Sequence, residues 1–345
     1  MKKKLQTALL VGALFGLGMN GPALAAKKHH HSVGKKAPVK AAPAKAAGLS
    51  KKTKAAYAQE LAYPVAGPKK VVHATVAPKR VAHAVAGDFE PGKLALYSAS
   101  ALVIDQSTGQ AILDKHSDAV TPIASISKLM TAMVVLDAKL DLQEVISIGE
   151  EDVDALKGTR SRLPVGTTMT RETAMLLALM SSENRAASAL GRHFPGGLPA
   201  FVAAMNRKAL SLGMTHSRFE EPTGLSSNNV STAHDLARMV TAAAGYPEIR
   251  QFSTTAEARV DLNGRLRDFG NTNALVRSDR WEIGVSKTGY ISEAGRCLVM
   301  QAKVAEKPVV IVLLDSVGKM TRVGDANRIK RWMESAALEG GRRAA

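Results

Sequence analysis

Three short motifs hold the residues of this chain that could do chemistry. Ser-Ile-Ser-Lys at 125–128 places a hydroxyl and an amine three positions apart, so that both lie on one face if the segment is helical. Ser-Glu-Asn at 182–184 supplies a second hydroxyl and an amide, and Lys-Thr-Gly at 287–289 supplies a cation beside a third hydroxyl. In this order the motifs provide a serine nucleophile, a hydroxyl–amide pair and a carboxylate-binding strand, which together predict an acyl-transfer enzyme.

The first motif pairs a nucleophile with a base. The hydroxyl of Ser125 attacks poorly until a base takes its proton, and Lys128 can be that base only if its pKa falls. Burial or a neighbouring cation would lower it. The apolar run 129–136 predicts a buried helix around Lys128, and Lys287 could supply the cation. At a helix start, Ser125 would also lie among free backbone N–H groups that suit a developing oxyanion.

The other two motifs predict proton transfer and substrate binding. Ser182 could pass a proton to a leaving amine and Asn184 could hold a substrate amide, although either residue taken alone is typical of a helix cap. Lys287 and Thr288 are predicted to end a strand and to bind a terminal carboxylate. Gly289 removes a side chain, so an extended peptide could approach the strand edge and add to it as a further strand.

Lys-Thr-Gly occurs once in the chain, whereas the other two motifs recur, and only the setting identifies their functional copies. Ser32 and Ser316 also begin a Ser-x-x-Lys sequence, and Ser226 and Ser227 begin Ser-x-Asn. Ser32 lies in a low-complexity stretch and Ser316 between a strand and a turn. Ser125 alone begins an apolar-periodic run, which favours it as the nucleophile.

Strand patterns occupy both ends of the main region, and helical patterns fill its middle. The expected strands are 98–105, 110–114, 282–288, 297–305 and 309–315. The expected helices begin near 125 and cover 172–180, 185–193, 198–212, 233–244 and 323–337, with the whole of 145–275 predicted as short helices. This order predicts an α/β (α+β) fold, in which an antiparallel sheet from the chain ends is flanked by helices and carries an inserted helical subdomain. Ser125 would lie at the junction, where clefts form.

The first 26 residues are typical of an export signal. Lys2–Lys4 form a positive start, 8–19 are apolar, and small residues allow cleavage after Ala25 or Ala26. An uncleaved anchor is the alternative, but about 20 apolar residues are needed to span a membrane. The signal therefore predicts export to the periplasm.

Residues 27–93 read as a basic, Ala/Lys/Pro-rich disordered linker. Residues 27–90 hold 13 Lys and Arg and three acidic residues, so much of the net charge of +17 lies there. A solvated spacer is one interpretation and adhesion to an anionic envelope surface is another. Nucleic acid is disfavoured because aromatic stacking residues are missing. His29–His31 could hold a metal loosely, but no metal site is expected. A peptidase domain at 94–338 and a tail at 339–345 would follow.

Cys297 is the only cysteine of the chain, so no intrachain disulfide can form. Its apolar neighbours predict a buried, inert thiol.

The settings of the three motifs resemble the low-molecular-mass penicillin-binding proteins of the D-alanyl-D-alanine carboxypeptidase/endopeptidase family. The segments 221–225 and 231–236 add to the likeness, which covers about 95–338. Ser-Glu-Asn in the middle motif is similar to the endopeptidase branch of the penicillin-binding protein 7 type, whereas many carboxypeptidases have Gly between Ser and Asn. The resemblance implies a β-lactamase/transpeptidase-like fold.

The resemblance also implies a role for each motif residue. Ser125 would attack a D-alanyl carbonyl and form an acyl-enzyme that water releases, with Lys128 as the general base. Ser182 would relay the proton, and Asn184 would orient the substrate and the lysine. The substrate-binding residues would be Lys287, Thr288 and Gly289, with the backbone N–H groups of Ser125 and Tyr290 as the oxyanion hole.

The implied function is that of a periplasmic serine DD-peptidase without a cofactor. Its substrate would be the stem peptides of peptidoglycan, and β-lactams would be covalent inhibitors. A D-alanyl-D-alanine endopeptidase is favoured over a carboxypeptidase, because membrane-bound carboxypeptidases of this family carry a further C-terminal β domain for which a chain ending at Ala345 leaves no room. A β-lactamase and a non-catalytic wall-binding or penicillin-sensing protein are the rival interpretations.

Overall fold

The computed structural model describes residues 94–344, with side chains as far as 338. The predicted export signal at 1–26, the linker at 27–93 and His29–His31 lie outside the described residues, so the expectations about them stay predictions. Within 94–344, no helix is both long enough and apolar enough to cross a membrane.

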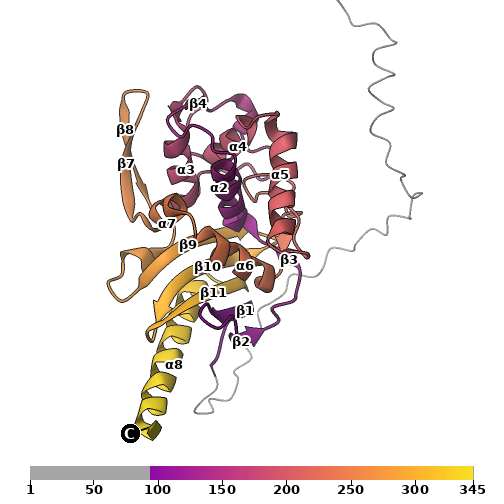
Figure 1. The fold of residues 1–345 in the computed structure, drawn as a ribbon. Coiled ribbons are helices and arrows are strands. Elements are labelled where there is room, and N and C mark those ends of the chain that lie inside the picture. The colour runs from indigo at the N-terminus through magenta and orange to yellow at the C-terminus, as the bar shows by residue number, and fades with distance from the viewer. Residues whose placement is uncertain (1–93, 345) are drawn as a thin grey trace, which may run out of the picture. The chain divides into compact units, whose positions relative to one another are not determined.

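One five-stranded antiparallel sheet is built from the two ends of the described chain, as the sequence predicts (Figure 1). Its strands are β1 (Ser98–Asp105), β2 (Ala111–Lys115), β9 (Glu282–Ile291), β10 (Gly295–Val304) and β11 (Lys307–Ser316). Their order across the sheet is β2-β1-β11-β10-β9, so β11 lies between β1 and β10, and β9 is an edge strand. In β1 and β11, Ser98 is opposite Ser316 and Asp105 is opposite Val309.

Both faces of the sheet are covered, which explains the nearly continuous apolar run in β11. Side chains alternate between faces along a strand. Val310 and Val312 accordingly pack into the core of the helical region, whereas Ile311 and Leu313 pack against Ala326 and its neighbours on α8. Figure 1 shows the helical region on one side of the sheet and α8 (Thr321–Ala344) on the other.

The inserted helical region carries six α-helices, and α2 is at its centre. Its helices are α2 (Ser127–Asp137), α3 (Arg171–Met180), α4 (Asn184–Arg192), α5 (Gly197–Ser211), α6 (Ala233–Ala243) and α7 (Pro247–Thr254). Nine of the 11 residues of α2 are buried, as its apolar sequence predicts. Short elements complete the region: η1 (Ala124–Ile126), η2 (Glu150–Asp152), η3 (Ala274–Arg277), β3 (Thr121–Pro122), β4 (Val145–Ser147), β5 (Thr168–Thr170) and β6 (Val230–Ser231).

Two segments differ in secondary structure from the prediction. The segment 257–270, expected to be helical, forms the hairpin β7 (Glu257–Leu262) and β8 (Arg265–Gly270). Its turn is Asn263-Gly264, and both residues have positive φ, which is the arrangement that favours a two-residue hairpin turn. The closing helix α8 continues to Ala344, through residues that the sequence assigns to a tail.

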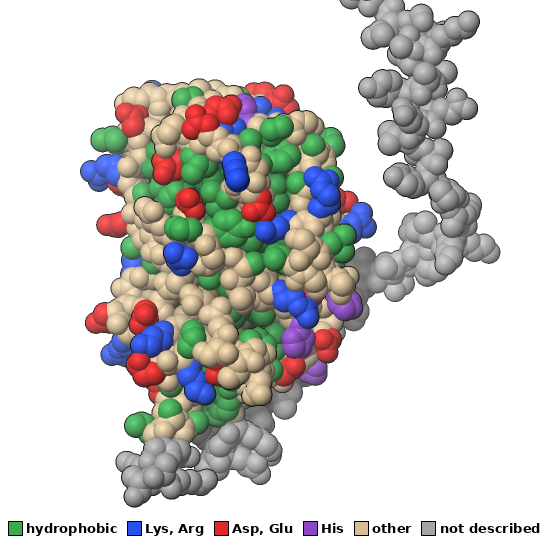
Figure 2. Space-filling view, viewed as in Figure 1, with side chains coloured by type: hydrophobic (Ala, Val, Ile, Leu, Met, Phe, Trp, Pro, Cys, Tyr) green, Lys and Arg blue, Asp and Glu red, His purple; other side chains and the backbone are tan. Residues whose placement is uncertain are grey.

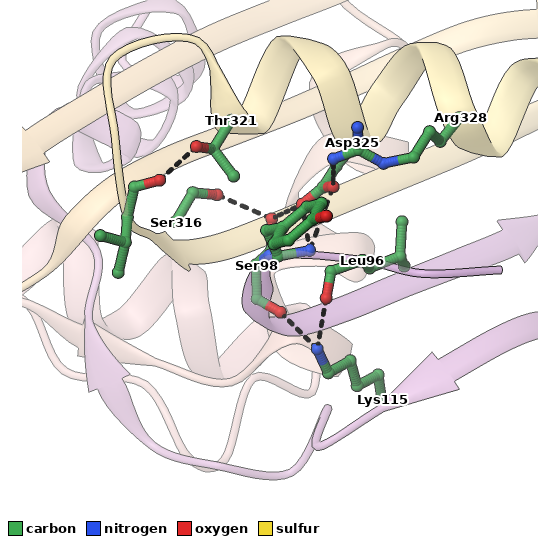
Figure 3. A network of polar contacts seen from close by, with 9 residues as sticks. Leu96, Ser98, Lys115, Ser316, Thr321, Asp325 and Arg328 are labelled. Atoms are coloured by element: carbon green, nitrogen blue, oxygen red, sulfur yellow. Dashed lines mark hydrogen bonds and ion pairs between the residues drawn. The ribbon is translucent and has the colours of Figure 1, made fainter. Parts of the chain in front are cut away.

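A buried carboxylate fastens β1 to α8 and β11 (Figure 3). The Asp325 side chain is fully buried, pairs with Arg328, and accepts hydrogen bonds from the backbone N–H of Ser98 at 2.7 Å and from its hydroxyl at 2.6 Å. The hydroxyls of Ser98 and Ser316 lie 2.7 Å apart. Ser316 therefore belongs to a structural network, as its setting in the sequence indicates.

Charged side chains of both signs are interspersed over the face shown in Figure 2. No field of a single sign covers this face, which suits a domain whose sequence charges are nearly balanced.

Candidate active site

The three motifs meet at the junction between the sheet and the helical region. The Lys128 Nζ atom lies 2.9 Å from Ser125 Oγ and 2.7 Å from Asn184 Oδ1. The Lys287 Nζ atom donates to Ser182 Oγ at 2.9 Å. Five functional side chains from three distant parts of the chain thus form two hydrogen-bonded groups, which lie close enough for the charge of Lys128 to act on Lys287. The geometry would let a proton leave Ser125 toward Lys128 and let a second proton pass through Ser182.

Ser125 lies in the 3-10 turn η1, one turn before the α-helix that carries Lys128. Ala124, just before it, has a φ of 49°, and Ser182 has a φ of 61°. A non-glycine residue in this left-handed region costs about 1–3 kcal/mol, and surrounding contacts must hold it there. The two hydroxyls are therefore placed by strained backbone at both motifs.

Burial is what makes Lys128 a plausible base. Its side chain is completely buried, and this burial lowers its pKa from 10.5 to about 7. The carboxylates of Glu221 and Glu183 oppose the shift by favouring the charged form. The sequence suggests two causes for a lowered pKa of Lys128, which are burial and the neighbouring cation of Lys287. Burial is therefore the effective one. Lys287 is itself affected: burial, Lys128 and Arg322 hold its pKa well below the usual value.

The loop 221–224 completes the site, and sequence reasoning missed its role. The carbonyl of Thr223 accepts a hydrogen bond from Lys128 Nζ at 2.6 Å. The Glu221 carboxylate shapes the loop by accepting from the backbone N–H groups of Thr223 and Gly224, both at 2.6 Å. Two signals in the sequence pointed to this loop: Pro222-Thr223-Gly224 is typical of a turn, and the segment 221–225 adds to the family resemblance, although neither gave the loop a role in the site.

Gly224 allows this loop to touch the backbone that holds Ser125. Its φ is +81°, and a Cβ atom there would lie 1.9 Å from the carbonyl oxygen of Ala124. We expect Gly224→Ala to displace η1 and to slow acylation by a fluorescent penicillin about 100-fold, the usual cost of a misplacement near 1 Å. Gly109→Ala is the matched control, because Gly109 has a φ of +72° and open space around it. Equal acylation rates in the two variants would contradict this role.

Gly289 lies against the backbone that carries Ser125. A Cβ atom there would lie 3.0 Å from the Ala124 Cβ and 3.1 Å from the Ser125 backbone nitrogen. The missing side chain therefore lets η1 pack on β9, and the close approach of a peptide to the strand edge stays a prediction. The prediction that Thr288 ends the strand was wrong, since β9 continues to Ile291. β9 is nevertheless an edge strand, as strand addition by a substrate requires.

Ser182 and Asn184 do not cap α4. Their side chains contact Lys287 and Lys128, respectively, and Glu183 occupies the N-cap position without a capping hydrogen bond. The Glu183 carboxylate is 5% exposed and is held by the Ser161 hydroxyl at 2.7 Å and by Arg162 Nε at 2.8 Å. This gives a structural role to a residue whose role the sequence left open.

Arg322 of α8 is a second residue that sequence reasoning missed. Its guanidinium donates to the carbonyls of Gly289 at 2.8 Å and Cys297 at 3.2 Å, and so adds positive charge beneath β9. No local pattern marks it, because it approaches from the end of the chain.

Cys297 is fully buried, and burial raises its pKa to about 11, which confirms the inert thiol. Tyr290 is 56% exposed, and the guanidinium carbon of Arg296 lies 4.5 Å from the centroid of its ring.

Comparisons with known proteins agree with this geometry. The family model described as D-alanyl-D-alanine carboxypeptidase matches residues 88–318. The D-alanyl-D-alanine endopeptidase of Pseudomonas aeruginosa is 49% identical over 250 residues, covering 72% of this chain and 81% of that protein. The D-alanyl-D-alanine endopeptidase of Escherichia coli is 48% identical over 243 residues, covering 70% and 78%. The crystal structure of a Streptomyces DD-transpeptidase is similar with a TM-score of 0.66 and 26% identity, over 70% of this chain and 99% of that one.

Proposed function

The chain belongs to the D-alanyl-D-alanine carboxypeptidase family of serine peptidases, and from this premise we propose that it is an endopeptidase that cleaves the D-alanyl peptide bonds cross-linking peptidoglycan. The observation that carries the proposal is the 2.9 Å contact between Ser125 Oγ and the amine of a completely buried lysine. Burial there gives the amine a pKa of about 7, so a large fraction is neutral and can accept a proton near neutral pH.

In the acylation step, Ser125 Oγ attacks the carbonyl carbon of the D-alanyl residue while Lys128 Nζ takes its proton. The carbonyl oxygen becomes an oxyanion, which the backbone N–H groups of Ser125 and Tyr290 stabilise. The C–N bond then breaks, and Ser182 delivers its proton to the leaving amine and is reprotonated with the proton that Lys128 took from Ser125, so Lys128 is neutral again before deacylation. The hydrogen bond from Lys287 to Ser182 supports this route, because it orients the relay hydroxyl.

In the deacylation step, water attacks the ester of Ser125 and transfers a proton to Lys128. The ester bond breaks, Ser125 regains its proton, and the D-alanyl carboxylate leaves. Asn184 contributes by holding Lys128 Nζ at 2.7 Å, which keeps the amine in place through both steps.

The substrate peptide is placed along β9. Lys287 and Thr288 lie on this edge strand, and Arg322 adds positive charge beneath it, so a peptide carboxylate would be attracted there. Backbone hydrogen bonds to the strand edge would align the peptide with Ser125. β-Lactams would enter the same site and acylate Ser125. We place the enzyme in the periplasm on the strength of the export signal in its sequence.

A rapid β-lactamase is disfavoured by the positions of three glutamates. The Glu221 carboxylate accepts from the loop backbone, Glu220 from Ser226, and Glu172 from Gln143. Each carboxylate already has a partner of its own, whereas fast deacylation of class A type needs a glutamate that holds a water molecule beside the ester.

Digestion of purified sacculi tests the proposal. We expect the wild-type enzyme to convert cross-linked dimers into monomers, because the bond that it cleaves joins two stem peptides. The products would be separated by chromatography and identified by mass. Loss of terminal D-alanine with intact dimers would make the protein a carboxypeptidase, and no change at all would favour a non-catalytic wall-binding protein.

A further inference from the structure

A cleft with three arginines lies between the hairpin β7–β8 and the segment 162–167. Its volume is about 310 Å³. It is lined by Arg162, Pro164, Val165, Gly166, Thr167, Leu262, Asn263, Arg265 and Arg267. No lining residue is acidic, so three positive charges face one small space. We call it the arginine cleft.

The alternation of the hairpin puts its arginines on the cleft side. Arg265 is opposite Leu262 in the ladder, and Arg267 is opposite Val260. Residues opposite one another lie on the same face of the hairpin, and Leu262 on this face is 5% exposed. Arg265 and Arg267 therefore lie on the inner face of the hairpin. Arg259 and Asp268, which form an ion pair at 2.6 Å, lie on the opposite face.

The tip of the hairpin is fixed to the opposite wall. Asn263 Oδ1 accepts from the backbone N–H of Thr168 at 3.1 Å, and its Nδ2 donates to the carbonyl of Gly166 at 3.1 Å. Figure 1 shows the hairpin standing alongside the helical region. The cleft is therefore formed before any ligand binds, which lowers the entropic cost of binding.

Two of the three arginine charges of the cleft have no acidic partner within the part of the chain that the structure describes. There, Arg265 and Arg267 have no carboxylate partner. Arg162 uses Nε for Glu183 at 2.8 Å and stacks over the ring of Phe269 at 4.3 Å. Its terminal N–H groups make no hydrogen bond among residues 94–338, so they can bind a ligand in addition to Glu183.

The cleft is linked directly to the active site. Glu183, the ion-pair partner of Arg162, lies between Ser182 and Asn184 in the chain. Arg162 in the wall of the cleft is thus connected to Ser182, the proposed proton relay, through the ion pair with Glu183 and one peptide unit. A substrate that extends a few residues beyond the cleaved bond covers about 3.3–3.6 Å per residue, so its extension is long enough to leave the immediate surroundings of Ser125.

We propose that the arginine cleft binds a carboxylate of the leaving peptide, the strand of the cross-link that departs with the amine. This rests on the proposed endopeptidase function, and it names the part of the substrate that a carboxypeptidase would lack. A peptide with a free carboxylate fits the chemistry, because planar guanidinium groups bind carboxylates through paired N–H donors. The small volume fits one or two residues of such a peptide.

Replacing both hairpin arginines tests the proposal. We expect Arg265→Gln with Arg267→Gln to raise KM for a cross-linked dimer from sacculi about tenfold with kcat unchanged, because the lost contact binds substrate and transition state equally. With dimers whose carboxylates are amidated, the same variant should show no further rise in KM. Amidation also affects any contact of the dimer with Lys287, but it does so equally in the wild type and in the double variant. A rise in KM that the arginine substitutions cause only with free carboxylates therefore measures the contribution of the cleft.

Arg259→Gln is the matched control, because it removes an arginine from the outer face of the same hairpin. We expect its KM to equal that of the wild type. An unchanged KM in the double variant, an equal penalty with free and amidated dimers, or an equal effect in Arg259→Gln would each overturn the proposal. Failure of the endopeptidase function itself would look different, since the wild type would then leave both dimers uncut.

Discussion

Ser125→Ala is expected to abolish covalent labelling by a fluorescent penicillin and to lower cross-link cleavage about 10⁶-fold, the scale seen when a serine nucleophile is removed. Ser125 is the hydroxyl that contacts the buried amine of Lys128, so it is the oxygen that can form the acyl bond. Labelling is read by gel fluorescence, and cleavage by chromatography of digested sacculi. Circular dichroism would show that the variant is folded.

Ser316→Ala is the control for this experiment, because Ser316 begins another Ser-x-x-Lys sequence. Its hydroxyl contacts Ser98 in the network of Figure 3, which joins β1 and β11 to Asp325 of α8. We expect this variant to label normally. Labelling of Ser125→Ala would show that another residue is the nucleophile. Rapid multiple turnover of nitrocefin by the wild type would instead identify a β-lactamase.

The acylation rate is expected to rise with pH and to level off above about 7. Burial lowers the pKa of Lys128 to about 7, so below that pH the amine is protonated and cannot take the proton of Ser125. The rate should therefore fall about tenfold for each unit below the pKa and stay constant above it. Stopped-flow measurement of penicillin acylation between pH 5 and 9 would show the profile.

Lys128→Arg tests whether residue 128 acts as a base or only as a positive charge. Arginine keeps a cation at this position but is not deprotonated in proteins, so we expect acylation to fall at least about 1,000-fold at every pH. Lys139→Arg, on an exposed lysine after α2, should leave the profile unchanged. A profile of wild-type shape in Lys128→Arg would assign the pH dependence to a different group.

Local patterns were enough to predict the sheet and the three motifs. The strands of the sheet are apolar because both faces are covered, and this makes them visible in the sequence. The burial of Lys128 could be predicted for a similar reason, since the residues that follow it are apolar and belong to a central helix. The family resemblance added the fold, and the matched relatives confirm it.

Features that depend on contacts between distant segments could not be predicted. The hairpin β7–β8 is rich in charged residues and resembles no buried strand, although Asn263-Gly264 marks its turn. The packing role of Gly289 depends on η1, more than 150 positions earlier in the chain. Glu221, Arg322 and the pair of Arg162 with Glu183 also act on partners that no local spacing reveals.

The position of β11 between β1 and β10 sets the order in which the protein can mature. The first strand has no neighbour on that side until almost the whole polypeptide has emerged from the ribosome, and such non-local pairing closes slowly. We therefore expect a nascent or truncated chain without β11 to have no catalytic activity. The catalytic groups on β9 thus depend on a sheet that only the late strand β11 completes, so activity can appear only after most of the chain has been made.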